Sequence, residues 1–366
     1  MKAARDALAD ALHLKPGRSD RLLGCLYGQA IGDALGARYE FLRAEKARRT
    51  VEVDVGRDDA AFLRILGEGA FRLEEGEVTD DTELAMTLAR SLLRKGAYDN
   101  DDVALCYLKW ELTKPLTHGK TTYRAFGSGT LTQELVDSLD SPADFVSSNA
   151  QQHNLESLSN GFLMRISPLA IAAVDWPVEK LRECAKLNCR LTNLKEICQD
   201  AVAAYVTAIH ALLNGASPQK AFDQALAASQ REEVRNHLIA SKSPAIQVRL
   251  PDGQDVDGDQ KGMGYYGIAL QWAFQQLLLQ SAQQGSNSGF YSSLKELVSR
   301  GGDADTNSCI AGALLGAHYG SRAIPRAWKR AVKTARPDRA LEKFPDVLLH
   351  DIETVAARLP RCRQPP

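Results

Sequence analysis

The stretch LLGCLYGQAIGDALG, residues 22–36, repeats glycine at every fourth position and places apolar side chains at helical spacing between the glycines. A second stretch, AGALLGAHYG at residues 311–320, repeats the pattern. Positions four apart lie close to one face of a helix, and each glycine in a helix interior costs about 1 kcal/mol relative to alanine. The two ladders therefore indicate that something approaches each helix backbone closely. Another helix is the favoured neighbour, and one arrangement packs these two stretches against each other.

Helical periodicity continues along most of the chain and predicts an all-α, compact multi-helix fold. The further helical patterns cover residues 80–95, 101–113, 161–174, 178–189, 196–214, 218–228, 264–284, 290–299, 306–319 and 346–358. Strand-like alternation is confined to a short run at 246–250. Three stretches, 43–78, 114–160 and 241–262, mix charges, glycines and small polar residues, and they are expected to be irregular.

No linker or internal repeat divides the chain, so we expect a single domain at 19–366 behind an N-terminal extension at 1–18. This extension has helical apolar spacing and stops at a Lys-Pro-Gly sequence. One interpretation is a packing helix or a frayed terminus, and the other is an arm that binds a partner protein.

The overall composition excludes several classes of function. Lys and Arg total 45 against 46 Asp and Glu, which argues against a nucleic-acid-binding surface. The chain has no apolar stretch long enough to span a membrane, and its first residues do not resemble a signal peptide. Seven cysteines without a CxxC pair are typical of reduced thiols in a cytoplasmic protein.

Two acidic clusters carry the chemistry. TDDTE at 79–83 and GGDADTN at 301–307 each stand directly before an apolar helical run. Such residues often cap a helix and suit its dipole, so either cluster alone has an ordinary structural explanation. If the two helix starts meet, however, four aspartates converge, and their charges repel unless they are protonated or bridged by cations. Oxygen ligands alone favour Mg²⁺, Mn²⁺ or Ca²⁺ over Zn²⁺, and the set fits two ions that activate a water.

A third acidic run, between residues 252 and 259, has aspartate at positions 252, 255, 257 and 259. The glycine and the closing glutamate of an EF-hand loop are misplaced here, so a solvated turn is the better interpretation. Cys184, Cys189 and Cys198 likewise lack the spacing of a zinc site.

Four stretches together resemble the ADP-ribosylglycohydrolase family. They are GQAIGDALG at 28–36 with Glu40, TDDTE at 79–83, NGFLMR at 160–165, and GGDADTN at 301–307 with the glycine ladder behind it. Their order and spread resemble the family from about residue 19 to 320. The resemblance implies an all-helical, magnesium-dependent fold with a dinuclear metal site.

The resemblance also implies roles for individual residues. The implied metal ligands are Thr79, Asp80, Asp81, Asp303, Asp305 and Thr306. Glu40 matches an acidic residue that in part of the family acts at the metals, so Glu40 and Asp303 are the expected catalytic residues. The alternative for Glu40 is an ordinary solvated glutamate at a helix end.

Two further stretches are expected to hold the ligand. Gly127, Ser128 and Gly129 are placed like a family loop that approaches the diphosphate, although a plain turn explains them equally well. The loop expected to line the ADP-ribose pocket contributes Asn160, Gly161, Met164 and Arg165. One departure concerns Asn193, which stands where many relatives have histidine.

These expectations combine into a metal-dependent hydrolase that removes ADP-ribose from a mono-ADP-ribosylated protein, with arginine as the favoured linkage. Such an enzyme reverses an ADP-ribosyltransferase and can act as an antidote, or immunity protein, to an ADP-ribosylating toxin. The alternative is a binding protein that occludes such a toxin through residues 1–18. Neither hypothesis involves a nucleic acid or a membrane.

Overall fold

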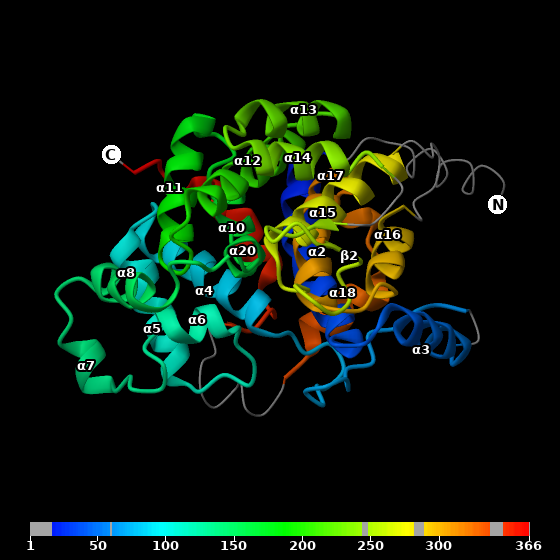
Figure 1. Ribbon diagram of the computed structural model, residues 1–366, viewed down its shortest axis with the longest axis horizontal. Helices are drawn as coiled ribbons and strands as arrows, with labels where there is room; N and C mark the ends of the chain where they lie inside the picture. Colours follow the sequence, from blue (N-terminus) through cyan, green and yellow to red (C-terminus); the bar gives the residue numbers. More distant parts are fainter. Residues whose placement is uncertain (1–16, 59–60, 244–247, 282–288, 337–346, 366) are drawn as a thin grey trace.

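A computed structural model describes residues 17–58, 61–243, 248–281, 289–336 and 347–365. Within these residues the fold is almost entirely helical, so the predicted all-α class is confirmed (Figure 1). In the same residues, no helix is both long and apolar enough to cross a bilayer.

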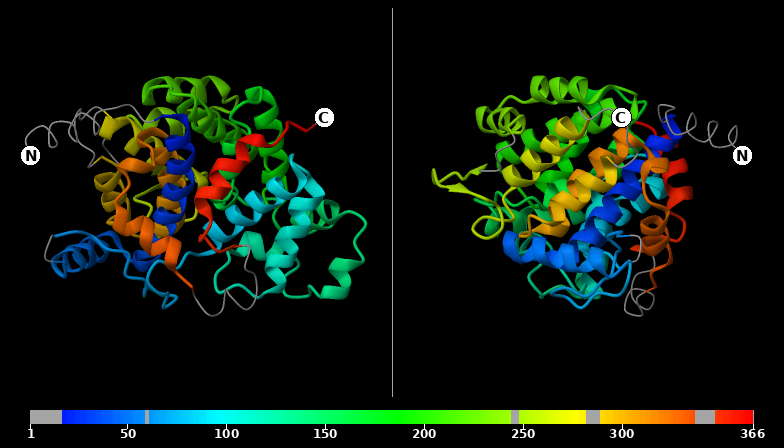
Figure 2. Two further views of the ribbon diagram at one scale, coloured as in Figure 1. Left: turned by 180° about the vertical axis from the view of Figure 1, so that it is seen from behind. Right: turned by 90° about the vertical axis from the view of Figure 1, so that its right-hand side faces the viewer.

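The two glycine ladders form the centre of the molecule, as one of the predicted arrangements requires. They lie on α2 (Arg18–Gly36) and α17 (Ala304–Tyr319), drawn side by side in blue and orange in Figure 2. A Cβ atom added to Gly28 would lie 2.1 Å from the carbonyl oxygen of Gly312, and one added to Gly316 would lie 1.9 Å from that of Gly24. No larger residue fits such a distance, which explains why the helix interiors carry glycine.

The pairing also fixes the direction of the two helices. Gly24 faces Gly316, Gly32 faces Ser308, and Gly36 faces the residue at position 304. Partner numbers fall along one helix as they rise along the other, so the helices are antiparallel. The end of α2 therefore lies beside the start of α17, and the ladder brings residues just after position 32 to the acidic sequence at 301–307.

The other helices surround this pair. In chain order they are α3 (Ala44–Gly56), α4 (Asp80–Lys95), α5 (Asn100–Leu112), α6 (Lys120–Ala125), α7 (Gln133–Asp137), α8 (Pro142–His153), α9 (Gly161–Met164), α10 (Ser167–Ala172), α11 (Val178–Arg190), α12 (Glu196–Leu213), α13 (Pro218–Ala228), α14 (Glu232–Ala240), α15 (Tyr266–Ser281), α16 (Gly289–Val298), α18 (Arg326–Thr334) and α20 (Ile352–Arg358). Within the described residues there are also three short 3₁₀ helices: η1 (Ala37–Tyr39) after α2, η2 (Ser321–Ala323) between α17 and α18, and η4 (Leu359–Arg361) after α20. α15 and α16 pack on α17, whereas α4, α5 and α8 form a second group.

The expectation of irregular structure was wrong in two of the three stretches. The stretch 43–78 contains α3, which buries only Ala47, Val51 and Asp54, so its apolar face is too narrow to give a helical pattern. The stretch 114–160 contains α8, whose Ser and Asn residues have low helix propensity.

One predicted helix is divided in two. The pattern at 161–174 forms α9 and α10, which are separated by Arg165 and Ile166. Pro168 stands at the start of α10 and cannot supply an N–H to the preceding turn, so the first helix ends before it. The strand predicted at 246–250 corresponds to β1 (Val248–Arg249), and its first two residues lie outside the described residues. β1 pairs antiparallel with β2 (Asp255–Val256), which was not predicted.

The seven cysteines are all buried free thiols. Burial raises the pKa of the Cys184 thiol to about 11 and that of the Cys198 thiol to about 12. Residues 1–16 of the predicted extension lie outside the described residues, while Gly17 and Arg18 already belong to the start of α2.

Candidate metal and ADP-ribose site

Three helix termini meet at one end of the glycine ladder: the end of α2, the start of α4 and the start of α17. Asp33, near the end of α2, accepts hydrogen bonds from the backbone N–H groups of Thr79 at 3.1 Å and Thr82 at 3.0 Å. It also accepts one from the Thr79 hydroxyl at 2.9 Å. The start of α4 is thus attached to α2, and the register of the ladder places the start of α17 beside both.

The capping explanation of the two acidic clusters is therefore not sufficient. Neither Thr79, at the N-cap of α4, nor Asp303, at the N-cap of α17, makes a side-chain capping bond. At α4 this task falls to Asp33 from another helix, which leaves Asp80 and Asp81 available for other contacts. Asp80 accepts a further bond from Gly119 N–H at 3.3 Å, which connects the loop before α6 to the site.

A short segment after α2 carries Glu40 into the same place. The Phe41 N–H donates to the Gly302 carbonyl at 2.7 Å, and the Gly302 N–H donates back to Leu42 at 2.9 Å. A Cβ atom on Gly301 would lie 2.1 Å from the Leu42 carbonyl oxygen, so this close approach requires glycine before Asp303. The two glycines of the GGDADTN motif thus join Glu40 to the start of α17.

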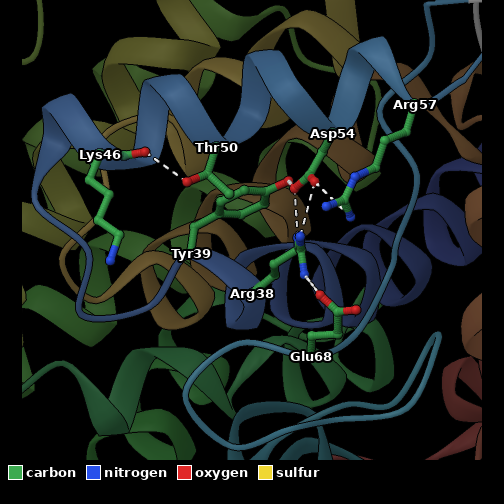
Figure 3. A network of polar contacts seen from close by, with 7 residues as sticks. All are labelled: Arg38, Tyr39, Lys46, Thr50, Asp54, Arg57 and Glu68. Atoms are coloured by element: carbon green, nitrogen blue, oxygen red, sulfur yellow. Dashed lines mark hydrogen bonds and ion pairs between the residues drawn. The ribbon is translucent and has the colours of Figure 1, made fainter.

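A buried ion-pair network holds this segment from its other side (Figure 3). The Arg38 guanidinium donates to both oxygens of Asp54, at 2.6 and 3.0 Å, and the Tyr39 hydroxyl donates to Asp54 Oδ2 at 2.9 Å. Arg38 also pairs with Glu68, and Arg57 lies 3.4 Å from the same Asp54. Asp54 belongs to α3, so this helix fixes Arg38 and Tyr39, the two residues before Glu40, in place.

The carboxylates form two overlapping groups that share Asp305. One oxygen each of Asp33, Asp81 and Asp305 lie within 4.8 Å of one another, and so do oxygens of Glu40, Asp303 and Asp305. All five side chains come from residues that expose little or no surface. Glu40, only 8% exposed, is not the solvated glutamate of the alternative interpretation.

Burial and mutual repulsion determine the electrostatics of the cluster. Burial, reinforced by the charge of Asp303, raises the pKa of Glu40 to about 9. Burial and the neighbouring carboxylates also raise the pKa of Asp81 and of Asp305 well above the usual range. The pKa of Asp33 rises only to about 6, because its hydrogen bonds to Thr79 and Thr82 partly offset burial.

The donor set fits divalent cations. Asp81 Oδ1 and Glu40 Oε2 are buried and have no hydrogen-bond partner. Buried carboxylates without partners are costly, and convergent oxygen ligands suit hard divalent ions. The acidic cluster can therefore hold metal.

A cavity of ≈460 Å³ opens beside the carboxylates, and it collects most of the predicted site residues. The predicted residues that line it are Glu40, Asp80, Asp81, Asn160, Gly161, Met164, Asp303, Asp305 and Thr306. Thr79 lies behind the wall, where its hydroxyl oxygen is 2.9 Å from Asp33 Oδ1 and 3.0 Å from Asp81 Oδ2 and can donate its one proton to either.

Asn160 connects the ligand-binding motif to the acidic one, because its amide donates to Asp303 Oδ2 at 2.6 Å. Arg165 does not reach the cavity. It is fully buried, donating to the Gly161 carbonyl at 3.2 Å and to the Thr192 hydroxyl at 2.9 Å, and its position supports the wall instead of contacting a ligand.

The remaining predicted ligand residues lie further out. Gly127, Ser128 and Gly129 follow α6, all with positive φ, and they are not among the residues that line the cavity. Asn193 is buried as well, and its amide donates to the Ser159 carbonyl at 3.3 Å, so it supports the loop that carries Asn160.

Several site residues were not identified from the sequence. Asp33 was not predicted to belong to the site. The signal that could have identified it is a lone acidic residue on the glycine-lined part of an apolar helix. Phe41, His118 and Lys120 also line the cavity. Nothing in their local sequence separates them from ordinary surface residues.

The acidic run at 252–259 is placed quite differently. Asp252 and Asp255 are exposed and pair with Lys261 and Arg249, each at 2.8 Å. Asp259 accepts a hydrogen bond from the Ala44 N–H at 2.9 Å and so caps α3.

Comparison with known proteins agrees with this geometry. The sequence profile described as ADP-ribosylglycohydrolase matches residues 14–358. The chain is 26% identical to the ADP-ribosyl-[dinitrogen reductase] glycohydrolase of Rhodospirillum rubrum, covering 91% of this chain and 97% of that protein. It is 27% identical to the ADP-ribosylarginine hydrolase Tri1 of Pseudomonas putida (strain GB-1), covering 86% and 74%, and 26% identical to human ADP-ribosylhydrolase ARH3, covering 85% and 88%.

A solved structure, described as an ADP-ribosylglycohydrolase-related protein complex, is 27% identical and superposes with a TM-score of 0.68 over 94% of this chain and 98% of that one. The match of the family profile over nearly the whole sequence, the helical fold and the buried acidic cluster lead to one conclusion: this chain is a hydrolase of the ADP-ribosylglycohydrolase family, whose members depend on metal.

Proposed function

We propose that this enzyme removes ADP-ribose from arginine side chains of mono-ADP-ribosylated proteins. The observation that carries the proposal is the meeting of five buried carboxylates, two of them with unpartnered oxygens and four of them lining one cavity. The arginine linkage is supported by the name of the Pseudomonas putida relative, an ADP-ribosylarginine hydrolase, and a protein substrate by the name of the Rhodospirillum rubrum relative.

The predicted metal ligands are well placed for two divalent ions, Mg²⁺ or Mn²⁺. We assign them to Thr79, Asp80, Asp81, Asp303, Asp305 and Thr306. Bound there, the ions would orient the ribose hydroxyls and lower the pKa of a water. Asp33 acts behind this set, because its oxygens already accept hydrogen bonds from Thr79 and Thr82.

Glu40 and Asp303 are the residues that we assign to catalysis. The reaction breaks the bond between the ribose anomeric carbon and the guanidine nitrogen and forms a bond from that carbon to a water oxygen. Glu40 Oε2, buried and without a partner, is available to accept the proton that this water loses and to pass it to the departing guanidine nitrogen. Asp303 is held by the Asn160 amide and orients the ribose.

The rest of ADP-ribose would lie along the cavity wall formed by Asn160, Gly161 and Met164. Arg165 fixes this wall from behind through the Gly161 carbonyl. The turn at 127–129 follows α6, whose first residues line the cavity, and we keep it as a proposed contact to the outer part of the diphosphate.

Release of ADP-ribose from a substrate modified on arginine tests the proposal. We expect release by the purified protein with Mg²⁺ and none after EDTA treatment. The double variant Asp303→Ala plus Asp305→Ala should lose activity by a factor of about 10³ or more. Asp252→Ala plus Asp255→Ala is the matched control, because it removes two exposed aspartates, and it should keep full activity. Failure of the wild type to act on an arginine-linked substrate would contradict the proposal.

A finer hypothesis is that the enzyme protects a cell from an ADP-ribosyltransferase toxin, through hydrolysis or through binding by residues 1–18. The first sixteen of these residues lie outside the described residues. Deletion of residues 1–16 tests the binding role: loss of toxin binding with hydrolysis intact would support it, and unchanged binding would exclude it.

A further inference from the structure

An exposed aromatic pair stands at the wall of the cavity, directly beside Glu40. Phe41 is 51% exposed, which is unusual for so large an apolar side chain, and Phe71 is half-buried next to it. Both line the cavity, and their ring centroids lie 5.9 Å apart at an interplanar angle of 70°. Part of the aromatic surface of this pair is thus exposed in the same cavity as the carboxylates.

The position of Phe41 is determined by the backbone around it. Its φ is +63°, in the left-handed region that few residues other than glycine adopt without strain. Its N–H group donates to Gly302 at 2.7 Å, and the segment before it is held by the Arg38–Asp54 pair. A Cβ atom on Gly69 would lie 2.5 Å from the Ala37 carbonyl oxygen, so the loop that carries Phe71 packs directly on this segment.

The neighbouring charges indicate which chemical group this face would recognise. Glu40, the residue before Phe41, places an oxygen within 4.8 Å of oxygens of Asp303 and Asp305. A planar cation is attracted both by these carboxylates and by the negative face of an aromatic ring. The guanidinium of arginine has this combination of shape and charge.

The place of Phe41 along the substrate follows from the same neighbours. The reacting ribose carbon must lie at the carboxylates, and adenine occupies the opposite end of ADP-ribose. A residue adjacent to Glu40 therefore faces the leaving group.

From these observations we propose that Phe41, backed by Phe71, is a specificity-determining residue that stacks on the guanidinium of the ADP-ribosylated arginine. This inference rests on the proposed function and adds to it the surface that selects the linkage. The pair distinguishes arginine from a serine linkage, since a serine leaving group has neither charge nor a planar face.

Three variants test whether the aromatic face of Phe41, and not the size of its side chain or the stability of the protein, determines activity on the arginine linkage. Phe41→Leu keeps an apolar side chain without the aromatic face, Phe41→Tyr keeps the face, and Val53→Ala alters an equally exposed residue of α3. For the arginine-linked substrate we expect Phe41→Leu to lower kcat/KM by about 3- to 30-fold, mainly through KM. We expect Phe41→Tyr and Val53→Ala to remain close to wild type. On a serine-linked substrate, Phe41→Leu should cause no comparable fall, and an equal fall on both linkages would overturn the inference.

Two binding measurements complete the test independently of turnover. Calorimetry with ADP-ribose should give the same Kd for wild type and Phe41→Leu, and a weakened Kd would place the ring against adenine and overturn the inference. Agmatine titrated into the ADP-ribose-saturated protein should bind less tightly to Phe41→Leu than to wild type. If the wild type fails to cleave arginine-linked substrate, the proposed function fails, whereas unchanged agmatine binding in Phe41→Leu contradicts the role of Phe41 alone.

Discussion

Two groups of aspartates in this molecule have similar sequences and different surroundings. The group at the ends of α2, α4 and α17 is buried, and its members raise one another's pKa values. The group at 252–259 is mostly exposed, with Asp252 and Asp255 each paired to its own cation. Acidic residues close together in sequence therefore do not define a site.

The difference arises from the segments that bring the residues together. The buried group comes from helices distant in sequence, held in register by backbones so close that a Cβ atom added to Gly316 would lie 1.9 Å from the Gly24 carbonyl oxygen. The exposed group lies within one loop, where each side chain can find a partner or water. When the fold brings carboxylates from distant segments together despite their mutual repulsion, this arrangement indicates a bound ligand. Acidic residues that are merely close together in one loop do not.

The largest effect on stability is expected from disrupting the close packing of α2 on α17, which brings the buried carboxylates together. Gly28→Ala places a methyl group 2.1 Å from the Gly312 carbonyl oxygen, so the two central helices must separate. We expect a loss of about 3 kcal/mol or more in the free energy of unfolding, despite the better helix propensity of alanine.

The control for this prediction lies in the exposed loop. Gly253 has a φ of +82° and no atom within 4 Å of an added Cβ. Gly253→Ala should therefore cost only about 1 kcal/mol, the price of the left-handed conformation. Urea unfolding measures both variants, and equal losses would mean that the ladder contact is not what holds α2 to α17.

A smaller effect on stability is expected from adding a divalent cation, which would give the buried carboxylates the partner that they lack. Mg²⁺ at 100 times its Kd should raise the free energy of unfolding by about 2.7 kcal/mol, because it binds the native state alone. Thermal unfolding with and without EDTA measures the shift. Asp252→Ala plus Asp255→Ala should keep the shift and Asp303→Ala plus Asp305→Ala should lose it; the reverse result would place the ion in the exposed loop.

Much of this architecture could be predicted from the sequence, because it depends on local patterns. The helix at 80–95 has the predicted bounds, and the two glycine ladders pack together in one of the arrangements expected from their spacing. The two acidic motifs point to the site because each is a compact signal at a helix start.

What could not be predicted depends on contacts between distant segments. The role of Asp33 depends on the hydrogen bonds that the backbone N–H groups of Thr79 and Thr82, at the start of α4, donate to its carboxylate. The exposure of Phe41 follows from a left-handed φ enforced by Gly302, which no local pattern indicates. Arg165 was predicted to bind the ligand, yet its side chain is buried and donates to the Gly161 carbonyl behind the cavity wall.

The smallest effect is expected from removing one charge of the buried group, which should raise the stability of the protein while abolishing its activity. Asp305 is buried, and the charges of Glu40 and Asp303 disfavour its ionised form, so its pKa lies well above the usual range. Without metal, a buried carboxyl group whose pKa is raised in this way lowers the stability of the folded state at neutral pH, because the unfolded state ionises it freely. Asp305→Asn keeps an oxygen that can accept from the Thr306 N–H, whose bond is 2.8 Å, and removes the charge.

We therefore expect Asp305→Asn, in EDTA at neutral pH, to be more stable than wild type by about 1 kcal/mol, while it loses hydrolysis and the response to Mg²⁺. Asp252→Asn, which removes a charge that already has a cation beside it, should bring no such gain. A metal-free Asp305→Asn protein that is less stable than wild type would mean that the carboxylates do not repel one another. The buried and exposed aspartates would then differ in burial alone, and repulsion would no longer be an argument for a metal site.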